Sequence, residues 1–133
     1  MPTDYRAALE EYQRFAEQGD AQSMCHLGVM FGLGLGVAQS YSKAMFWYAE
    51  AARSGNTRAQ SNLGWMYGTG RGTTQDYTRA YAWYSVAAAD GEDVARYNRD
   101  LLAVSMTPGQ LERAQDFARD LARKIAANEA QLI

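Results

Sequence analysis

Three glycines alternate with other residues at Gly32, Gly34 and Gly36, a spacing found in loops that cradle phosphate groups. A phosphate loop follows a strand, and a lysine that binds the phosphates comes after its last glycine. No strand pattern precedes these glycines, and no lysine directly follows them. The same glycines also return later in the chain together with the residues around them. We therefore interpret the run as a tight connector between helices that needs positive φ angles, and not as a nucleotide site.

The single cysteine, Cys25, and the single histidine, His26, are neighbours in the sequence. Residues of one helix bind a metal together when they are three or four positions apart, and a cysteine-histidine nucleophile pair needs side chains that face each other from different elements. The carboxylates are single or are neutralised by nearby arginines, as over residues 116–123, so no pair is placed for acid and base catalysis. The sequence thus predicts no enzyme activity, no metal, no cofactor and no small-molecule substrate.

The composition is that of an ordered globular chain. Of its 133 residues, 47% are hydrophobic and 21% are charged, which excludes disordered and collagen-like chains. Thirteen basic residues stand against fifteen acidic ones, so no basic field exists to attract nucleic acid. One cysteine cannot form an internal disulfide, residues 1–6 lack the apolar core of a secretory signal, and no apolar stretch reaches membrane-spanning length. We expect a cytoplasmic protein that binds neither nucleic acid nor membrane.

An internal repeat organises the chain. When the sequence is compared with itself at an offset of 36 residues, fourteen of the 36 pairs from Gly19 to Ser54 are identical. Roughly two identities are expected by chance from ordinary composition. The match is therefore a true repeat, and its period is typical of helical solenoids.

Each unit contains two helical patterns. Between Ala59 and Tyr67, apolar residues at spacings of 0, 4, 7 and 8 form one face of a short helix that we expect to end at Gly68. After the glycine-rich loop, a second helix begins behind its N-cap candidate Asp76 and ends just before Gly91.

A different pattern occupies the C-terminal tail. Residues 107–110 supply a threonine N-cap, a proline at the first helical position and a glutamine at the capping-box position. The charge-balanced polar face of the helix that follows favours a cap on the stack over a membrane-surface helix. The apolar stripe expected to dock consists of Leu111, Ala114, Phe117, Ala118, Leu121, Ala122, Ile125 and Ala126.

The unit at residues 57–91 is similar to the Sel1-like repeat, with a leading alanine, Leu-Gly-x-Met-Tyr, a Gly-x-Gly loop, Asp-Tyr-x-x-Ala, Trp-Tyr-x-x-Ala-Ala and a closing glycine. The unit at 21–55 is similar too, with Phe31 in place of the loop-entry tyrosine and Ser40 in place of the acidic N-cap. The resemblance implies an all-α fold, a short right-handed α-solenoid of antiparallel helix pairs with a C-terminal capping helix. We expect a single domain over residues 1–133, made of a half repeat at 4–19, repeats at 20–55 and 56–91, a degenerate half repeat at 92–106 and the capping helix at 107–133.

Small and aromatic residues recur where the repeat predicts close packing. Gly28 and Gly64 interrupt helices at a cost of about 1 kcal/mol each, which is acceptable where a neighbouring backbone or ring lies against them. The repeated alanines let helices approach closely. The aromatic residues expected to fill the space between layers are Trp47, Tyr48, Trp83 and Tyr84.

The resemblance extends to tetratricopeptide helix pairs, in which the first helix of each pair lines the concave surface. This register places Arg58, Asn62 and Trp65 on that surface. The neighbouring units place His26, Val29, Tyr97 and Asn98 on the same surface. Trp65 is either an interaction anchor or core packed under the terminal helix or against Tyr97, and the sequence leaves both interpretations open.

The resemblance implies a non-enzymatic adaptor, a bacterial regulatory scaffold that presents its concave surface to a protein or peptide partner. One alternative is a neutralising partner of a toxin or effector, which would use the same surface. Another is a penicillin-binding or β-lactam-hydrolysing protein, as in the cysteine-rich branch of Sel1-like proteins. That branch is stapled by cysteine pairs, whereas this chain has only Cys25 and no serine-lysine arrangement.

Overall fold

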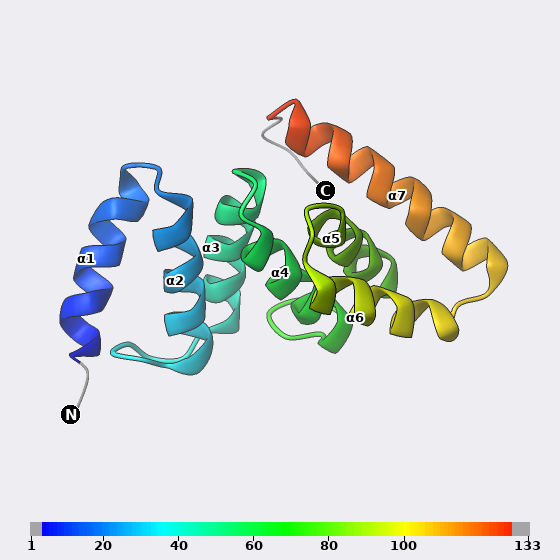
Figure 1. Cartoon of the computed structure of the whole chain (residues 1–133). Coiled ribbons are helices and arrows are strands. Elements are labelled where there is room, and N and C mark those ends of the chain that lie inside the picture. The colour runs from blue at the N-terminus through cyan, green and yellow to red at the C-terminus, as the bar shows by residue number, and fades with distance from the viewer. Residues whose placement is uncertain (1–3, 129–133) are drawn as a thin grey trace.

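Seven α-helices and no strand make up the part of the chain that the structure describes, residues 4–128 (Figure 1). In this computed structural model they are α1 (Tyr5–Glu17), α2 (Ala21–Leu33), α3 (Tyr41–Arg53), α4 (Thr57–Thr69), α5 (Tyr77–Ala89), α6 (Asp93–Val104) and α7 (Pro108–Ala126). Each helix from α1 to α6 packs on the next, and α7 packs back on α5. The predicted all-α fold, a short right-handed α-solenoid with a C-terminal capping helix, is confirmed. None of the helices described is long and apolar enough to cross a membrane.

Side-chain caps fix where the helices begin. The side chains of Ser40 and Asp76 accept hydrogen bonds from backbone N–H groups three residues ahead, at 3.2 Å and 3.0 Å. The prediction that Asp76 is an N-cap is confirmed. The predicted helix end at Gly68 is wrong, because α4 continues to Thr69 and ends where Gly70 adopts a left-handed conformation with φ 71°.

The alternating glycines join the two helices of the first full unit. Gly34 and Gly36 have φ 71°, as a tight connector requires, but Gly32 lies inside α2. The side-chain amide of Gln39 donates to the backbone oxygen of Gly32 at 2.8 Å, and Gln75 makes the equivalent bond one unit later. These glutamines therefore satisfy carbonyl groups that the end of a helix leaves without an intrahelical partner.

Two other glycines give tyrosine rings room to pack. A Cβ atom on Gly28 would lie 2.4 Å from the ring of Tyr48, and one on Gly64 would lie 2.8 Å from the ring of Tyr84. Each tyrosine belongs to the helix that follows its glycine in the chain. The expectation that a ring lies against these glycines is confirmed, and it explains why a weak helix former occupies the middle of α2 and α4.

Replacing Gly28 with alanine is therefore expected to lower the free energy of unfolding by about 1 to 3 kcal/mol, because the new methyl group overlaps the Tyr48 ring. Gly32 provides a matched control in the same helix. A Cβ atom there would lie 3.7 Å from Ala44, an ordinary contact, so Gly32→Ala is expected to stabilise the protein by up to about 1 kcal/mol. Urea unfolding of the two variants measures the difference. Equal stabilities would contradict the packing described.

The core follows the repeated alanines and aromatic residues. Leu27, Leu63, Met66, Trp83 and Leu121 are the largest fully buried side chains. Alanines of α3 and α5 are fully buried between the helices, which lets the stacked layers approach closely. Of the four aromatic residues expected between layers, three are buried, and Trp47 is only partly buried.

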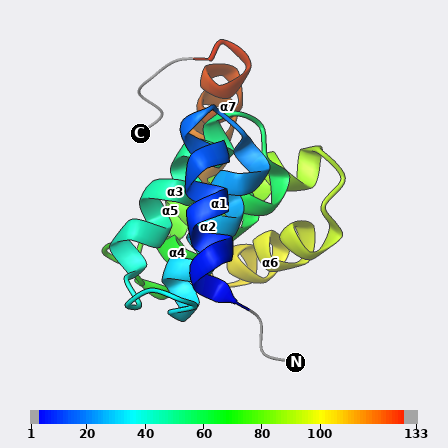
Figure 2. The same ribbon diagram turned by 90° about the vertical axis from the view of Figure 1, so that its left-hand side faces the viewer.

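The terminal helix begins as predicted and buries less than predicted. The Thr107 hydroxyl accepts from the backbone of Gln110 at 3.1 Å, and the Gln110 side chain accepts from the backbone of Thr107 at 2.9 Å, which completes a capping box. Figures 1 and 2 show α7 lying across one end of the stack, where it contacts chiefly α5. Ala122 and Ala126 were expected in the docked stripe but are exposed, because a single partner helix covers only a narrow seam.

Candidate functional site

A hollow of about 250 Å³ lies between α2 and α4, with α3 as its floor. Val29 and Leu33 come from α2 and supply an apolar wall. The facing wall belongs to α4, and tyrosine side chains of α3 lie between the two. The polar and aromatic residues that line it are Gln39, Tyr41, Tyr48, Arg58, Asn62 and Trp65.

A second hollow, of about 270 Å³, repeats the first one unit further along the chain. It lies between α4 and α6, and α5 forms its floor. Tyr77, Tyr84 and Asn98 line it at positions 36 residues after Tyr41, Tyr48 and Asn62. Leu101 takes the place that Trp65 has in the first hollow. Trp65 lines both, so it forms the wall that the two hollows share.

Trp65 is 44% exposed and is not covered by the terminal helix. The guanidinium group of Arg71 lies 4.9 Å from the centre of its ring, on the loop between α4 and α5. This cation-π contact orients the indole without burying it. Of the two interpretations that the sequence leaves open, the structure favours the exposed aromatic side chain.

Arg58 and Asn62 present unused polar groups to the first hollow. Within residues 4–128, neither side chain forms a hydrogen bond or an ion pair, whereas the Arg79 guanidinium lies 2.6 Å from the carboxylate of Asp76. In the second hollow, the side chain of Asn98 is hydrogen-bonded to Tyr84. The first hollow therefore offers a guanidinium and an amide that no described protein group satisfies.

The hydroxyl groups of Tyr48 and Tyr84 stay neutral at physiological pH. Burial raises the pKa of Tyr48 to about 12, although the charge of Arg58 opposes this shift. Burial also raises the pKa of Tyr84 to about 12, against the hydrogen bond from Asn98. The pKa of the buried Cys25 thiol is raised for the same reason, so the thiol is held in its protonated, unreactive form. The groups around the first hollow are thus suited to binding through hydrogen bonds.

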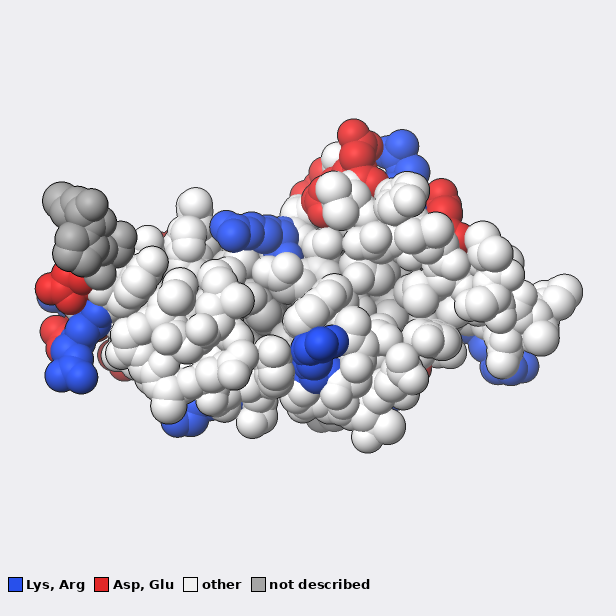
Figure 3. Space-filling model, turned by 90° about the horizontal axis from the view of Figure 1, so that it is seen from below, with Lys and Arg blue, Asp and Glu red and all other residues white. Residues whose placement is uncertain are grey.

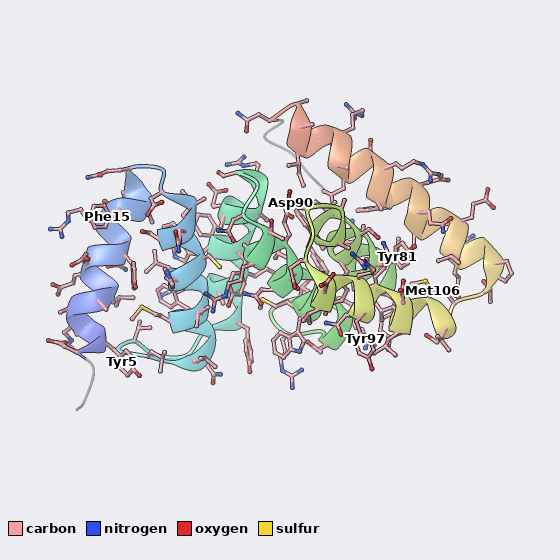
Figure 4. All side chains as sticks on the ribbon, in the orientation of Figure 1. Tyr5, Phe15, Tyr81, Asp90, Tyr97 and Met106 are labelled. Atoms are coloured by element: carbon pink, nitrogen blue, oxygen red, sulfur yellow. The ribbon has the colours of Figure 1, made fainter. Side chains whose placement is uncertain are left out.

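The structure brings together five of the residues predicted for the inner surface and leaves two apart. Val29, Arg58, Asn62, Trp65 and Asn98 line the two hollows. His26 instead stacks on the ring of Tyr12 from α1, with the ring centres 4.6 Å apart. Tyr97, labelled on α6 in Figure 4, is 65% exposed and lines neither hollow. Binding by any of these residues stays a prediction.

Sequence reasoning missed the tyrosines as functional candidates. Tyr48 and Tyr84 were assigned to packing alone, and Tyr41 and Tyr77 were not considered for the inner surface. The sequence did contain a signal. Tyr41 and Tyr48 recur 36 residues later as Tyr77 and Tyr84, and the inner-surface positions recur with the same period. In the described part of the chain, no group of three or more His, Cys, Asp or Glu residues is arranged to hold a metal ion.

Comparisons with known proteins agree with the helical geometry. The family model described as Sel1 repeat matches residues 1–20, 21–56 and 57–92. A protective antigen of uropathogenic Escherichia coli strains, whose crystal structure displays an SLR fold, superposes with a TM-score of 0.86 at 26% identity, over 98% of this chain and 28% of that one. A Sel1 repeat protein from Oxalobacter formigenes gives a TM-score of 0.62 at 35% identity, over 62% of this chain and 63% of that one. The chain thus spans about 28% of the length of the first neighbour, and no curated protein matches it.

Proposed function

The chain belongs to the Sel1 repeat family, and from that premise we propose that it is a non-enzymatic scaffold that binds a protein or peptide partner along the face formed by α2, α4 and α6. Sel1 repeat proteins generally act as protein-interaction scaffolds. Both structural neighbours come from bacteria, which supports a bacterial setting, and the proposal includes a regulatory role there.

The observation that carries this proposal is the exposed indole of Trp65 at the wall shared by two hollows. Tryptophan and arginine are the residues that most often dominate the free energy of protein interfaces. Here Trp65 lies within one hollow together with Arg58, which has no partner among the residues described. An aromatic side chain that the stacking does not bury is available for a partner.

Capture of the native partner tests the proposal. A pull-down from native lysate, read by mass spectrometry, identifies proteins retained by the parent chain. The double variant Trp65→Ala, Arg58→Ala is expected to weaken that capture at least tenfold, about 1.4 kcal/mol, while its melting temperature changes little.

The matched control is the double variant Phe15→Ala, Arg14→Ala. Phe15, labelled on α1 in Figure 4, is 42% exposed, and the Arg14 guanidinium lies 5.7 Å from its ring centre. This control removes a similarly exposed aromatic-arginine pair on α1, a helix that lines neither hollow, and is expected to retain full capture. Unchanged capture by the Trp65 variant would place the binding surface elsewhere, on α3 and α5 or on the charged face of α7. A collapse of its stability would show that Trp65 is needed for packing.

A further inference from the structure

We propose that the two hollows bind an extended, acidic segment of the partner, with one apolar side chain in each hollow and a carboxylate at Arg58. The inference rests on the proposed function and adds the chemistry and conformation of the ligand. Three observations support it. They are the repetition of the hollows, the charge around them and the half-buried amide of Asn62, with which no described protein group pairs.

The two hollows are translated copies of each other. The first hollow has Tyr48 on its floor and Asn62 on its wall. The second has Tyr84 and Asn98 at the equivalent places, 36 residues later in the sequence, and Trp65 separates the two hollows. A ligand that fills both must present apolar groups at a regular interval on either side of the indole. The hollows lie on either side of α4, and an α-helix with its side chains is about 10 to 12 Å across. An extended chain in the polyproline II conformation advances about 3.1 Å per residue and turns once every three residues, so every third side chain lies on the same side. Side chains about three residues apart on such a segment therefore reach both hollows.

The charge around the hollows is positive, although the whole chain has a net charge of -2. Arg58 lines the first hollow, Arg71 lies over Trp65, and neither hollow is lined by an acidic residue. The acidic residues of α6 already have partners, because Asp93 pairs with Arg96 at 3.2 Å and Asp100 with Arg99 at 3.1 Å.

Figure 3 shows the molecule from below, and the middle of that face carries basic but no acidic side chains. Acidic side chains appear there at one end and along one edge. A guanidinium without a partner favours a carboxylate, since both groups form charge-assisted hydrogen bonds in pairs.

Asn62 explains why an extended backbone fits better than a compact ligand. Its side-chain amide has two donor hydrogens and one acceptor oxygen, and no described protein group pairs with them. The main chain of an extended segment offers N–H and C=O groups that are not used internally. Asn62 can therefore bind the backbone between the two apolar side chains, whatever their identity.

Selection from a random library of linear dodecapeptides displayed on phage, with the full chain as bait, tests this inference. Peptides retained by the parent and not by Trp65→Ala are synthesised with a fluorescent label, and their Kd is measured by anisotropy. We expect Asp and Glu to outnumber Lys and Arg in the selected peptides, and we expect two apolar residues about three positions apart.

A charge reversal tests the role of Arg58. Arg58→Glu is expected to raise the Kd of the selected peptides at least tenfold, and exchanging the acidic residues of a peptide for lysine is expected to restore its binding to that variant. Arg113→Glu, the same charge change on the exposed face of α7, is expected to leave Kd unchanged.

Two results would overturn the inference without overturning the proposed function. Peptides that require Trp65 but are neutral or basic, or that bind equally to Arg58→Glu, would show a peptide site without a preference for acidic ligands. Failure to enrich any Trp65-dependent peptide would rule out an extended segment as the ligand, and capture from lysate would then decide separately whether this face binds a folded partner. Circular dichroism of each variant confirms that its helices are intact.

Discussion

Replacing Trp83 with alanine is expected to lower the free energy of unfolding by about 3 to 5 kcal/mol, the range found when large aromatic residues are truncated in cores. The Trp83 side chain is 1% exposed and belongs to the main hydrophobic cluster, which joins residues of the repeat helices with Leu121 of the terminal helix. Its removal leaves a cavity that the surrounding helices can only partly fill. Urea unfolding measures the loss as a lower midpoint at an unchanged slope.

The chain contains a matched control for this prediction. Trp47 occupies the same position in the preceding repeat, but it is only partly buried and packs edge-on against Phe46, with ring centres 5.1 Å apart. Trp47→Ala is therefore expected to lower the free energy of unfolding clearly less than Trp83→Ala does. Trp83→Phe is also expected to lower it less than Trp83→Ala does. It retains an aromatic ring, and it breaks no hydrogen bond, because the indole N–H has no hydrogen-bond partner among the residues described. A Trp83→Ala variant as stable as the parent would contradict the packing.

Local features of the repeat were predictable because their causes lie within a few residues or within one unit. Asp76 caps a helix through a bond to a backbone group three residues away, and the capping box after Thr107 is equally local. The contact between Gly28 and Tyr48 recurs with the repeat, so a weak helix former at a fixed position was enough to indicate it. The end of α4 at Thr69 was wrongly predicted at Gly68, because three glycines alternate there and only the backbone conformation shows which one ends the helix.

Features that depend on contacts between distant segments were not predictable from the repeat. Trp47 and Trp83 are identical in register, yet only Trp83 is fully buried. The surroundings of the two helices differ, because α7 packs on α5, whereas α3 has no comparable contact with it. The same docking decides that Ala122 faces solvent. The hollows around Trp65 likewise arise from side chains of three helices, so the register identified five of the residues on their walls but not the tyrosines on their floors.

Removing residues 107–133 is expected to make the protein associate or disappear from the soluble fraction. On α7, Leu121 is fully buried, and Phe117 and Ile125 are partly buried against the main cluster. Burying a large apolar side chain fully contributes about 1.5 to 3 kcal/mol, so loss of the helix removes several kcal/mol from a total that is typically about 5 to 15 kcal/mol. It also uncovers the face of α5 against which α7 packs, and a newly exposed apolar patch promotes association. Light scattering and thermal melting of the shortened chain measure both effects.

Two neighbouring substitutions separate the loss of the cap from the general effect of altering the helix. Leu121→Asp puts a charge at a position that is 0% exposed, whereas Ala122→Asp puts the same charge one residue further along, where the side chain faces solvent. The first variant is expected to reproduce the association of the shortened chain, because a charge without a partner is costly to bury. The second is expected to remain monomeric and to lose only the small difference in helix propensity between alanine and aspartate, about 0.7 kcal/mol. If the shortened chain instead stays monomeric and as stable as the parent, α7 is not needed to close the stack, and its apolar seam becomes a second surface on which a partner can bind.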